Sequence, residues 1–322
     1  MFTRPELDAA HALIGATLAP TPAIAWPLLA ARAGTEVWVK HENHLPTGAF
    51  KVRGGLVFMD AHRRGGGIVT ATRGNHGQSL AFAGRRAGVP VTIIVPHGNS
   101  NEKNAAMTGY GATLIEHGAD FDAARAHAGV LARDRGLLLV PSFHPALVQG
   151  VATWALELFS AAPELDTVYV PIGMGSGICG AILVRDMLGL RTEIVGVQSV
   201  GAAAYARSFQ EGRLVVLDSA TTHADGMATR VPDPAALAII QAGAARVITV
   251  TDDEVADAIR AYWTDTHNLA EGAGAAPLAG LMQEQGRMKG RRVGLPLCGG
   301  NIDLALFRSW VLGRDLGGLR PS

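Results

Sequence analysis

Short apolar runs alternate with amphipathic helical stretches along most of the chain, and this alternation restricts the possible fold more than any other feature. Buried strands are expected where such runs are bounded by Gly, Pro or polar residues, at 91–95, 137–140, 167–172, 193–197, 246–250 and 293–297. Helices are expected between them at 75–87, 121–135 and 251–267, the last opening with a capping-box pattern from Thr251 to Glu254. Strands that alternate with helices predict an α/β fold with parallel sheets covered on both faces.

Composition narrows the class of partner. The 322 residues are 48% hydrophobic, which allows sizeable cores and about two domains. The 28 basic and 28 acidic side chains balance, whereas proteins that bind nucleic acid or an anionic membrane surface carry a basic excess. There is no signal-peptide core and no run of ~18 apolar residues, and the only cysteines are Cys179 and Cys298, which favours a reducing, cytoplasmic location. We therefore expect a small-molecule partner, no nucleic acid and no membrane.

Lys51 has unusual surroundings for a lysine. It lies between Phe50 and Val52 in the segment TGAFKVRGG (47–55), directly after a glycine-containing turn. An amine among apolar side chains has a lowered pKa and, once neutral, can form a Schiff base with a carbonyl group. From the local sequence alone, a surface lysine at the start of a helix remains the alternative.

Two glycine-containing loops each precede a helix, where backbone N–H groups can face an anion. The loop TRGNHGQ (72–78) suits a carboxylate, although ordinary N-capping by Asn75 is by itself the commoner case. The loop IGMGSGICG (172–180) follows a strand and suits a phosphate. It also matches the dinucleotide fingerprint GxGxxG, but the next strand ends in Gln198-Ser199 without the acidic residue that holds a ribose, which disfavours NAD.

A further polar turn, CGGN (298–301), follows the strand expected at 293–297. A buried cysteine is usually only a small hydrophobic residue, whereas one beside a polar turn can hydrogen-bond a ligand. The histidines lack metal-binding spacing. Ser176 lacks the flanking glycines that a hydrolase nucleophile elbow requires, since Met174 and Ile178 occupy those positions.

Taken in this order, the four segments closely resemble the motifs of the fold-type-II pyridoxal-phosphate enzymes, in the serine/threonine dehydratase family. The likeness runs from about Thr21 to Asp303, nearly the whole chain. It implies a two-lobed α/β fold in which each lobe is a parallel-rich sheet flanked by helices. The expected large, cofactor-binding domain comprises residues 1–66 and 145–322, and the expected small, mobile domain comprises residues 67–144.

The resemblance also implies a role for each motif residue. Lys51 is the expected catalytic residue and holds pyridoxal 5′-phosphate as a Schiff base. The other expected cofactor contacts are Phe50 on the pyridine ring, Asn75 at its 3-hydroxyl, Gly173, Met174, Gly175, Ser176 and Gly177 around the phosphate, and Cys298 at the ring nitrogen. The expected substrate site consists of Thr72, Asn75 and His76 around the carboxylate, with Arg73 nearby.

Several departures from the family pattern refine these expectations. The phosphate loop carries Met174 and Ser176 where the family is often all glycine, and its anion site is expected to survive this change. Arg73 replaces a small residue and adds bulk and positive charge near the substrate, so racemase activity is not expected. The segment 223–226 resembles one near which some relatives bind a divalent cation, but Thr221 stands where a glutamate is usual, so no metal is predicted. The chain ends soon after Asp303, so no C-terminal regulatory domain is expected.

The expected activity is that of a lyase, the dehydration of a 3-hydroxy amino acid such as threonine, serine or phenylserine by α,β-elimination, giving a 2-keto acid and ammonia. One alternative keeps the cofactor but performs β-replacement. Such relatives tend to have an Asn-Thr-Gly type of loop where this chain has Asn75-His76-Gly77. Another alternative is a cofactor-binding protein without turnover. Because relatives are often dimers, a homodimer is expected.

Overall fold

The computed structural model describes residues 1–62 and 66–313, and these form two separate β-sheets. Within the described residues one sheet has six strands, in the order β1–β2–β10–β7–β8–β9, and the other has four, in the order β5–β4–β3–β6. Neighbouring strands are parallel except β1, which runs antiparallel to β2. The predicted α/β fold with parallel-rich sheets is therefore confirmed.

The strands of the larger sheet are drawn from both ends of the chain. They are β1 (Ala23–Ala25), β2 (Glu36–His41), β7 (Thr167–Pro171), β8 (Glu193–Ser199), β9 (Arg246–Val250) and β10 (Arg292–Leu297). Those of the smaller sheet come from one stretch, as β3 (Ile68–Ala71), β4 (Val91–Val95), β5 (Thr113–Glu116) and β6 (Leu138–Leu139). The central strands β7, β8 and β10 are buried almost throughout, as parallel strands covered by helices on both faces should be.

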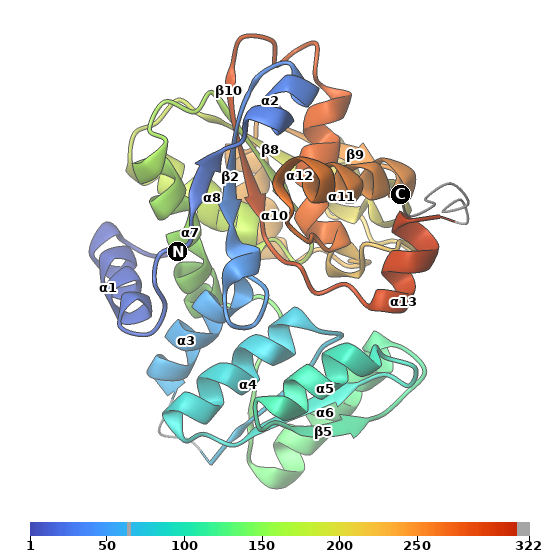
Figure 1. The fold of residues 1–322 in the computed structure, drawn as a ribbon. Helices are drawn as coiled ribbons and strands as arrows, with labels where there is room; N and C mark the ends of the chain where they lie inside the picture. Colours follow the sequence, from blue (N-terminus) through green and yellow to red (C-terminus); the bar gives the residue numbers. More distant parts are fainter. Residues whose placement is uncertain (63–65, 314–322) are drawn as a thin grey trace.

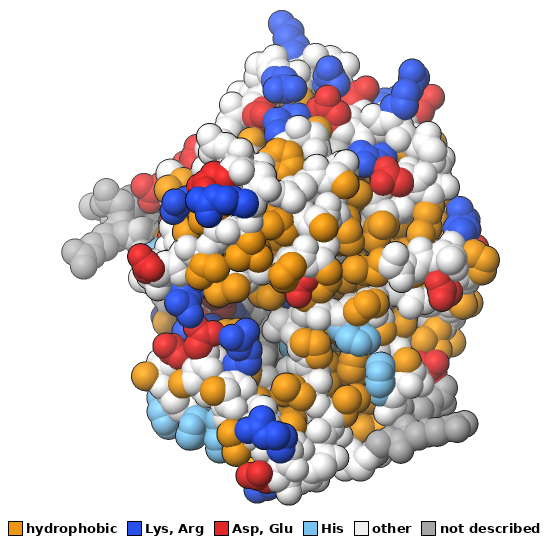
Figure 2. All heavy atoms as spheres, turned by 180° about the vertical axis from the view of Figure 1, so that it is seen from behind, with side chains coloured by type: hydrophobic (Ala, Val, Ile, Leu, Met, Phe, Trp, Pro, Cys, Tyr) orange, Lys and Arg blue, Asp and Glu red, His pale blue; other side chains and the backbone are white. Residues whose placement is uncertain are grey.

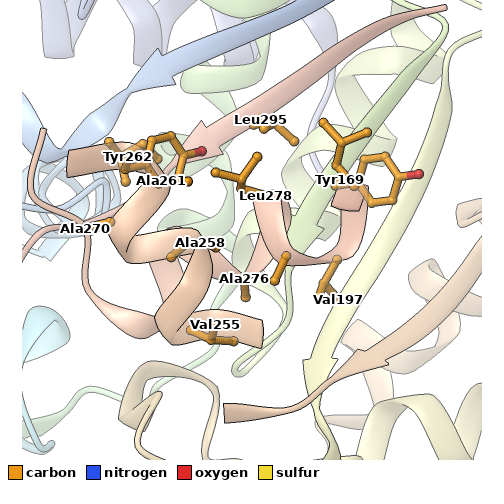
Figure 3. Close-up of a cluster of buried hydrophobic side chains, with 14 of the residues drawn as sticks. Tyr169, Val197, Val255, Ala258, Ala261, Tyr262, Ala270, Ala276, Leu278 and Leu295 are labelled. Carbon is orange, nitrogen blue, oxygen red and sulfur yellow. The ribbon is translucent and has the colours of Figure 1, made fainter. Parts of the chain in front are cut away.

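One face of the larger sheet is covered by α12 (Gly272–Gln283) and α11 (Asp252–Thr266). In α12 the residues from Gly272 to Leu281 are all buried, because an apolar helix with no polar face can only lie inside a core. Figure 3 shows Leu278 of α12 between Tyr262 of α11 and Tyr169 of the sheet. This packing fixes the N-terminus of α12 close to the end of β10.

The opposite face of the larger sheet carries α7 (Pro145–Ala161), α8 (Ser176–Met187) and α10 (Pro234–Gly243), whose apolar side chains form a second core around Trp154. The N-terminal helix α1 (Arg4–Gly15) packs against α7. The loop before α8 therefore opens at the carboxyl end of β7, the edge where open α/β sheets place ligands.

The smaller sheet is flanked by α4 (Asn75–Ala87), α5 (Asn101–Gly109) and α6 (Phe121–Arg135), which form the lower part of the molecule in Figure 1. Helix α3 (Lys51–His62) lies between the two parts and packs against both α4 and α7. The chain leaves the larger sheet through α3 and returns to it through α7, so the smaller sheet is an insertion between these two helices.

The remaining described elements are short. They are α2 (Pro27–Ala33), α9 (Ala204–Glu211), α13 (Leu304–Leu306), the 3₁₀ helices η1 (Glu42–His44), η2 (Val200–Ala202) and η3 (Asp225–Met227), and the π-helical turn η4 (Phe307–Val311). No helix in the described residues combines the length and the apolar character that crossing a membrane requires.

Several predicted elements are confirmed in detail. Helices α4 and α6 have the predicted bounds, and α11 lies within the predicted range with Thr251 and Glu254 forming the capping box. The strand predicted at 137–140 is wrong in length, because only Leu138 and Leu139 pair with β3. Strands β1, β2, β3 and β5 were not predicted.

Candidate active site

The predicted Schiff-base lysine and the predicted cysteine lie on paired segments. Ala49 forms an isolated antiparallel bridge with Gly299, and the backbone N–H of Phe50 donates to the carbonyl of Cys298 at 2.9 Å. Lys51 is the first residue of α3, so this bridge sets where the helix begins. Two motifs separated by most of the chain are thereby joined at the carboxyl end of β10.

The amine of Lys51 lies beside the start of α8. Its Nζ donates to Oγ of Ser176 at 3.5 Å and lies 5.2 Å from the centre of the Phe50 ring. Burial lowers the pKa of Lys51, and the nearby Cys298 and Glu271 only partly oppose this. An amine with a lowered pKa is available in the neutral form that nucleophilic attack and proton abstraction both require.

The glycine loop before α8 is built to leave amide groups free. Gly175 is the N-cap residue of α8 with φ +96°, and it provides no side-chain cap for the first turn. A Cβ on Gly173 would come within 2.2 Å of the carbonyl oxygen of Gly226, so only glycine fits there. The Tyr205 hydroxyl donates to the carbonyl of Met174 at 3.0 Å and holds the loop. Uncapped N–H groups at a helix N-terminus form an anion site.

Phe50 links this loop to the lysine. A Cβ on Gly177 would lie 3.4 Å from Cε2 of Phe50, an ordinary contact distance, so the ring lies directly against the start of α8. Ser176 is buried at the first position of the helix. The predicted cofactor contacts Phe50, Lys51, Gly175, Ser176 and Gly177 therefore form one continuous surface.

The loop at 72–76 holds Thr72 and His76 in buried positions. The backbone N–H of Gly74 donates to Oγ1 of Thr72 at 3.1 Å, which orders the turn. His76 is buried, and burial lowers its pKa to about 3, with the charge of Lys51 adding to the effect. Its Nε2 has no partner among the described residues, so a neutral imidazole is available for a ligand.

Asn75 does not cap its own helix, because the N-cap position of α4 is Gly74 and no side chain caps it. Its Nδ2 instead donates to Oε1 of Glu271 at 2.7 Å, and its Oδ1 accepts from Nδ2 of Asn301 at 2.8 Å. These bonds tie the smaller sheet's loop to both the CGGN turn and the N-terminus of α12.

Arg73 is the exception among the predicted site residues. Its side chain is exposed, and it takes part in none of the hydrogen bonds or ion pairs found among residues 1–62 and 66–313. Its place in the substrate site stays a prediction.

Cys298 directly follows β10 in a buried position, 4% exposed. Burial raises the pKa of its thiol well above the ordinary value, with the charge of Glu271 adding to this and that of Lys51 opposing it. Cys298 is therefore a neutral thiol. The nearby Tyr262 hydroxyl has no partner among the described residues.

The sequence interpretation missed Glu271. It is 3% exposed, and its only sequence signal is an acidic residue at the head of an otherwise apolar helix. It also missed a buried ion cluster formed by Lys40, Glu42, Arg53 and Glu157, whose members are far apart in the sequence.

The donor set suits pyridoxal phosphate. The molecule requires a lysine amine, an anion site for its phosphate and a largely apolar slot for its ring. The lowered pKa of Lys51, the uncapped start of α8 and the ring of Phe50 provide these in adjacent positions. The unpartnered Nε2 of His76 leaves a further polar atom facing the same site, as judged from the described residues.

Comparison with known proteins agrees with this interpretation. The family model "Pyridoxal-phosphate dependent enzyme" matches residues 14–299. The chain is 35% identical to the L-threonine ammonia-lyase of Geobacter sulfurreducens, over 85% of this chain and 69% of that protein. It is 32% identical to an L-threo-3-hydroxyaspartate ammonia-lyase of a Pseudomonas species, over 91% of this chain and 93% of that protein.

Solved structures give the same result. The processed form of threonine deaminase isoform 2 from Solanum lycopersicum superimposes with a TM-score of 0.87 and 27% identity, covering 95% of this chain and 88% of that one. Among the relatives found by sequence, biosynthetic threonine dehydratases also match, and the chain spans only 56% of their length. With the family model covering the chain from the end of α1 to the CGGN turn, this protein belongs to the pyridoxal-phosphate dependent enzymes.

Proposed function

We propose that the chain is a dehydratase of the ammonia-lyase type, which removes water from a 3-hydroxy amino acid and yields a 2-keto acid and ammonia. The observation that carries this proposal is the position of Lys51, whose lowered-pKa amine lies between the Cys298 turn and the uncapped start of α8. The ammonia-lyase names of relatives that match 85–91% of the chain support it.

Each residue of the site has a separate proposed role. Lys51 would hold pyridoxal phosphate through its amine, with Phe50 against the ring, Cys298 at the ring nitrogen, and the amides of 173–177 together with Ser176 around the phosphate. When bound, this cofactor withdraws electrons from the amino-acid carbon that bears the amino group. The Lys51 amine would also remove the proton from that carbon, and its lowered pKa makes a neutral, proton-accepting amine available for this.

The carboxylate of the substrate would be held by the loop at 72–76. The Thr72 hydroxyl, the Asn75 amide and the Nε2 of His76 lie on or next to the N-terminus of α4, where the helix dipole favours an anion. Because Asn75 is also bonded to Glu271 and Asn301, carboxylate binding would be coupled to the larger sheet.

A substrate panel tests the function. Purified protein incubated with serine, threonine, phenylserine and 3-hydroxyaspartate should release a 2-keto acid from at least one. Lys51→Ala should abolish both this release and the visible absorbance of bound cofactor, whereas Lys289→Ala should change neither. Absence of keto acid from every member of the panel would refute the proposal, and product that forms only with an added thiol would indicate β-replacement.

We further infer that Arg73 selects among substrates. It is exposed and has no bonded partner in the described part of the chain, and it lies within the loop proposed to hold the carboxylate, directly after Thr72. Arg73→Ala should change the ranking of the panel, most of all for 3-hydroxyaspartate with its second carboxylate, while leaving cofactor affinity unchanged. An equal effect on every substrate would show that Arg73 does not select among them.

We also propose that residues 1–66 and 145–322 form a large cofactor domain and residues 67–144 a small mobile one. The two sheets support this division, because the smaller sheet lies within 68–139 and the larger draws on both flanking regions. Motion of the smaller part would open and close the site, since it carries the loop at 72–76 whereas the larger part carries the loop at 173–177.

A homodimer is proposed as the active assembly. Figure 2 shows apolar side chains gathered in a band across the face opposite to that of Figure 1. Independently of that view, the segment between β8 and α10 carries exposed apolar residues, among them Val200 (57% exposed) and Val216 (52% exposed). Apolar surface of this kind commonly marks an interface. Light scattering should give twice the chain mass, and the double change Val200→Asp, Val216→Asp should shift it toward the single-chain mass.

A further inference from the structure

Glu271 occupies the N-cap position of α12 but does not cap that helix. Its backbone N–H donates to the carbonyl of Gly299 at 3.0 Å, which fixes the residue against the CGGN turn. A Cβ on Gly299 would come within 2.3 Å of Oε1 of Glu271, so the carboxyl group packs directly on that glycine. The side chain is thus held in the site by its backbone and not by bonds to its own helix.

The two carboxyl oxygens of Glu271 have different surroundings. Oε1 accepts a hydrogen bond from Nδ2 of Asn75 at 2.7 Å. Oε2 is buried and has no partner among the described residues. A buried oxygen without a partner is costly unless it carries a proton or meets a ligand.

Glu271 lines a cavity of about 190 Å³ between the two parts of the molecule. Charged and polar side chains from both parts line this cavity. Lys103 of α5 is paired with Asp225 of η3, and Asp303 accepts from the Ser100 hydroxyl at 2.6 Å. His223 and Asn301 line it as well. Glu271 therefore lines space large enough for a small polar group, next to the loop proposed to hold the substrate.

The pKa of Glu271 is raised to about 7. Burial is the largest cause and the charge of Asp225 adds to it, while the charge of Lys103, the bond from Asn75 and the charge of Lys51 act in the opposite direction. A carboxyl group with such a pKa carries a proton for much of the time near neutral pH, as a general acid must.

We propose that Glu271 donates the proton that turns the departing β-hydroxyl group of the substrate into water, a role that rests on the dehydration proposed above. In this step Lys51 accepts the Cα proton, and the electron pair left on Cα forms the double bond to Cβ. The Cβ–O bond breaks, its electron pair stays on oxygen, and that oxygen takes the proton of Glu271. Glu271 is left as a carboxylate and regains a proton through the cavity.

Four other ionisable groups near the site are unsuited to this role. Lys51 is already the acceptor of the Cα proton. Lys103 is held in its ion pair with Asp225, and its pKa is raised, so it gives up a proton poorly. The pKa of the Cys298 thiol is far above neutral, and that of His76 is far below it, so neither is a proton donor tuned to neutral pH.

The variant Glu271→Gln separates proton donation from positioning. The amide oxygen of glutamine still accepts from Asn75, so the site geometry is kept while the acidic proton is lost. A hydroxyl group needs a proton to leave, whereas the chloride of β-chloroalanine leaves as an anion. Glu271→Gln should therefore lose about 100-fold or more of its keto-acid formation from serine, the range for general acid catalysis, yet stay within about threefold of the wild type on β-chloroalanine.

Glu284→Gln is the matched control, because it makes the same change at the other end of α12. It should leave unchanged the ratio of the rate with serine to the rate with β-chloroalanine. In the wild type this ratio should fall as the pH rises through about 7, since Glu271 must be protonated to act. Infrared titration adds a readout independent of turnover: the C=O band of a protonated carboxyl group should disappear over the same pH range and be absent from Glu271→Gln.

The outcomes distinguish the two proposals. If the wild type forms no keto acid from any hydroxy amino acid, the proposed function fails. If the wild type does form keto acid, the effect of Glu271→Gln on the two substrates decides the role of Glu271. Equal losses of activity on serine and on β-chloroalanine, or no loss on either, would show that Glu271 is not the proton donor. An infrared band that persists in Glu271→Gln would overturn the assignment as well.

Discussion

Cys298 is the residue whose chemistry distinguishes this site most clearly at the scale of a single side chain. Its thiol is neutral because burial raises its pKa. A neutral thiol is a weak hydrogen-bonding group, so a pyridine nitrogen beside it would lack the counter-charge that a carboxylate supplies. Without that charge, reactions that require a long-lived carbanion are disfavoured, whereas elimination can proceed as the proton is removed.

We therefore expect Cys298→Ser to retain dehydration within about threefold, because a hydroxyl group is also neutral and of similar size. Cys298→Asp should lose at least about tenfold, because a second carboxylate would be buried beside Glu271. Initial rates and the absorption spectrum of the cofactor-loaded variants provide the measurement. An aspartate variant with an unchanged rate and spectrum would show that Cys298 does not face the ring nitrogen.

The residues of the site were predictable to the extent that each carries a local signature. Lys51, the loop at 72–76 and the loop at 173–177 are marked by glycine and by a change from strand to helix. Glu271 carries no such mark, because an acidic residue before an apolar helix is usually only an N-cap. Its significance comes from Asn75, which lies 196 positions away, and only the fold brings the two together.

At the scale of elements, a buried ion cluster holds α3 in place. Arg53, 1% exposed, donates to Glu42 of η1 at 2.6 and 2.9 Å and to Glu157 of α7 at 2.7 and 2.8 Å. Lys40 of β2 donates to Glu157 at 2.5 Å. Because Arg53 is two residues after Lys51, the cluster fixes the first turn of α3 against both β2 and α7.

Arg53→Met should lower the free energy of unfolding by about 3–5 kcal/mol, because Glu42 and Glu157 would be left buried without their main partner. Urea unfolding followed by circular dichroism measures this. Arg292→Met provides the comparison, since its pairs with Glu36 and Glu164 are about half exposed and should contribute less than about 1 kcal/mol. Equal losses in the two variants would contradict the assignment.

The same cluster predicts sensitivity to acid. Burial alone would raise the pKa of Glu157, but the bonds and charges of Arg53 and Lys40 outweigh it and hold the pKa below the ordinary 4.5. A carboxyl group with a lowered pKa in the folded state stabilises the protein above its unfolded pKa, and this contribution is lost as the pH falls through the folded value. The difference in unfolding free energy between wild type and Glu157→Gln should therefore shrink below about pH 4.5.

Elements differ in how far their own sequence could predict them. Helices α4 and α6 were both predicted with their observed bounds, and α6 carries a complete local signal, with Asp120 as its N-cap and Gly136 as its C-cap. Strand β2 includes Lys40, a charge that does not normally lie in a buried strand, and it is compensated only by groups from η1 and α7. Strand β6 is shorter than predicted, because only two of its residues find a partner in β3.

For the whole molecule, the two parts meet through apolar packing of α3 against α4 and through polar contacts at the start of α5 and α6. Lys103 pairs with Asp225, Ser100 donates to Asp303 at 2.6 Å, and Arg230 pairs with Asp122 at 2.5 Å. Each joins the start of α5 or α6 to the larger part. Polar contacts exchange readily with water, as an interface that opens and closes requires.

The double change Ser100→Ala, Asp122→Ala should weaken the closed form without unfolding the protein. KM should rise about three- to tenfold and kcat should change less. The unfolding free energy should fall by less than about 3 kcal/mol, because Ser100 loses both its cap on α5 and its bond to Asp303, while Asp122 loses two largely exposed ion pairs. Steady-state kinetics on the best substrate of the panel provides the measurement. Arg4→Ala, which removes an exposed pair on α1, should leave KM unchanged. An unchanged KM in the double variant would count against mobility of residues 67–144.

The insertion of the smaller sheet between α3 and α7 has a genetic consequence. Because those two helices pack against each other, the chain departs and returns at neighbouring points. The intervening codons therefore form a cassette that carries the loop at 72–76 but neither Lys51 nor the loop at 173–177. Recombination at these two points would give a chimaera with the carboxylate loop of one parent and the lysine and phosphate loop of the other, which is a simple route by which such a scaffold acquires new substrates.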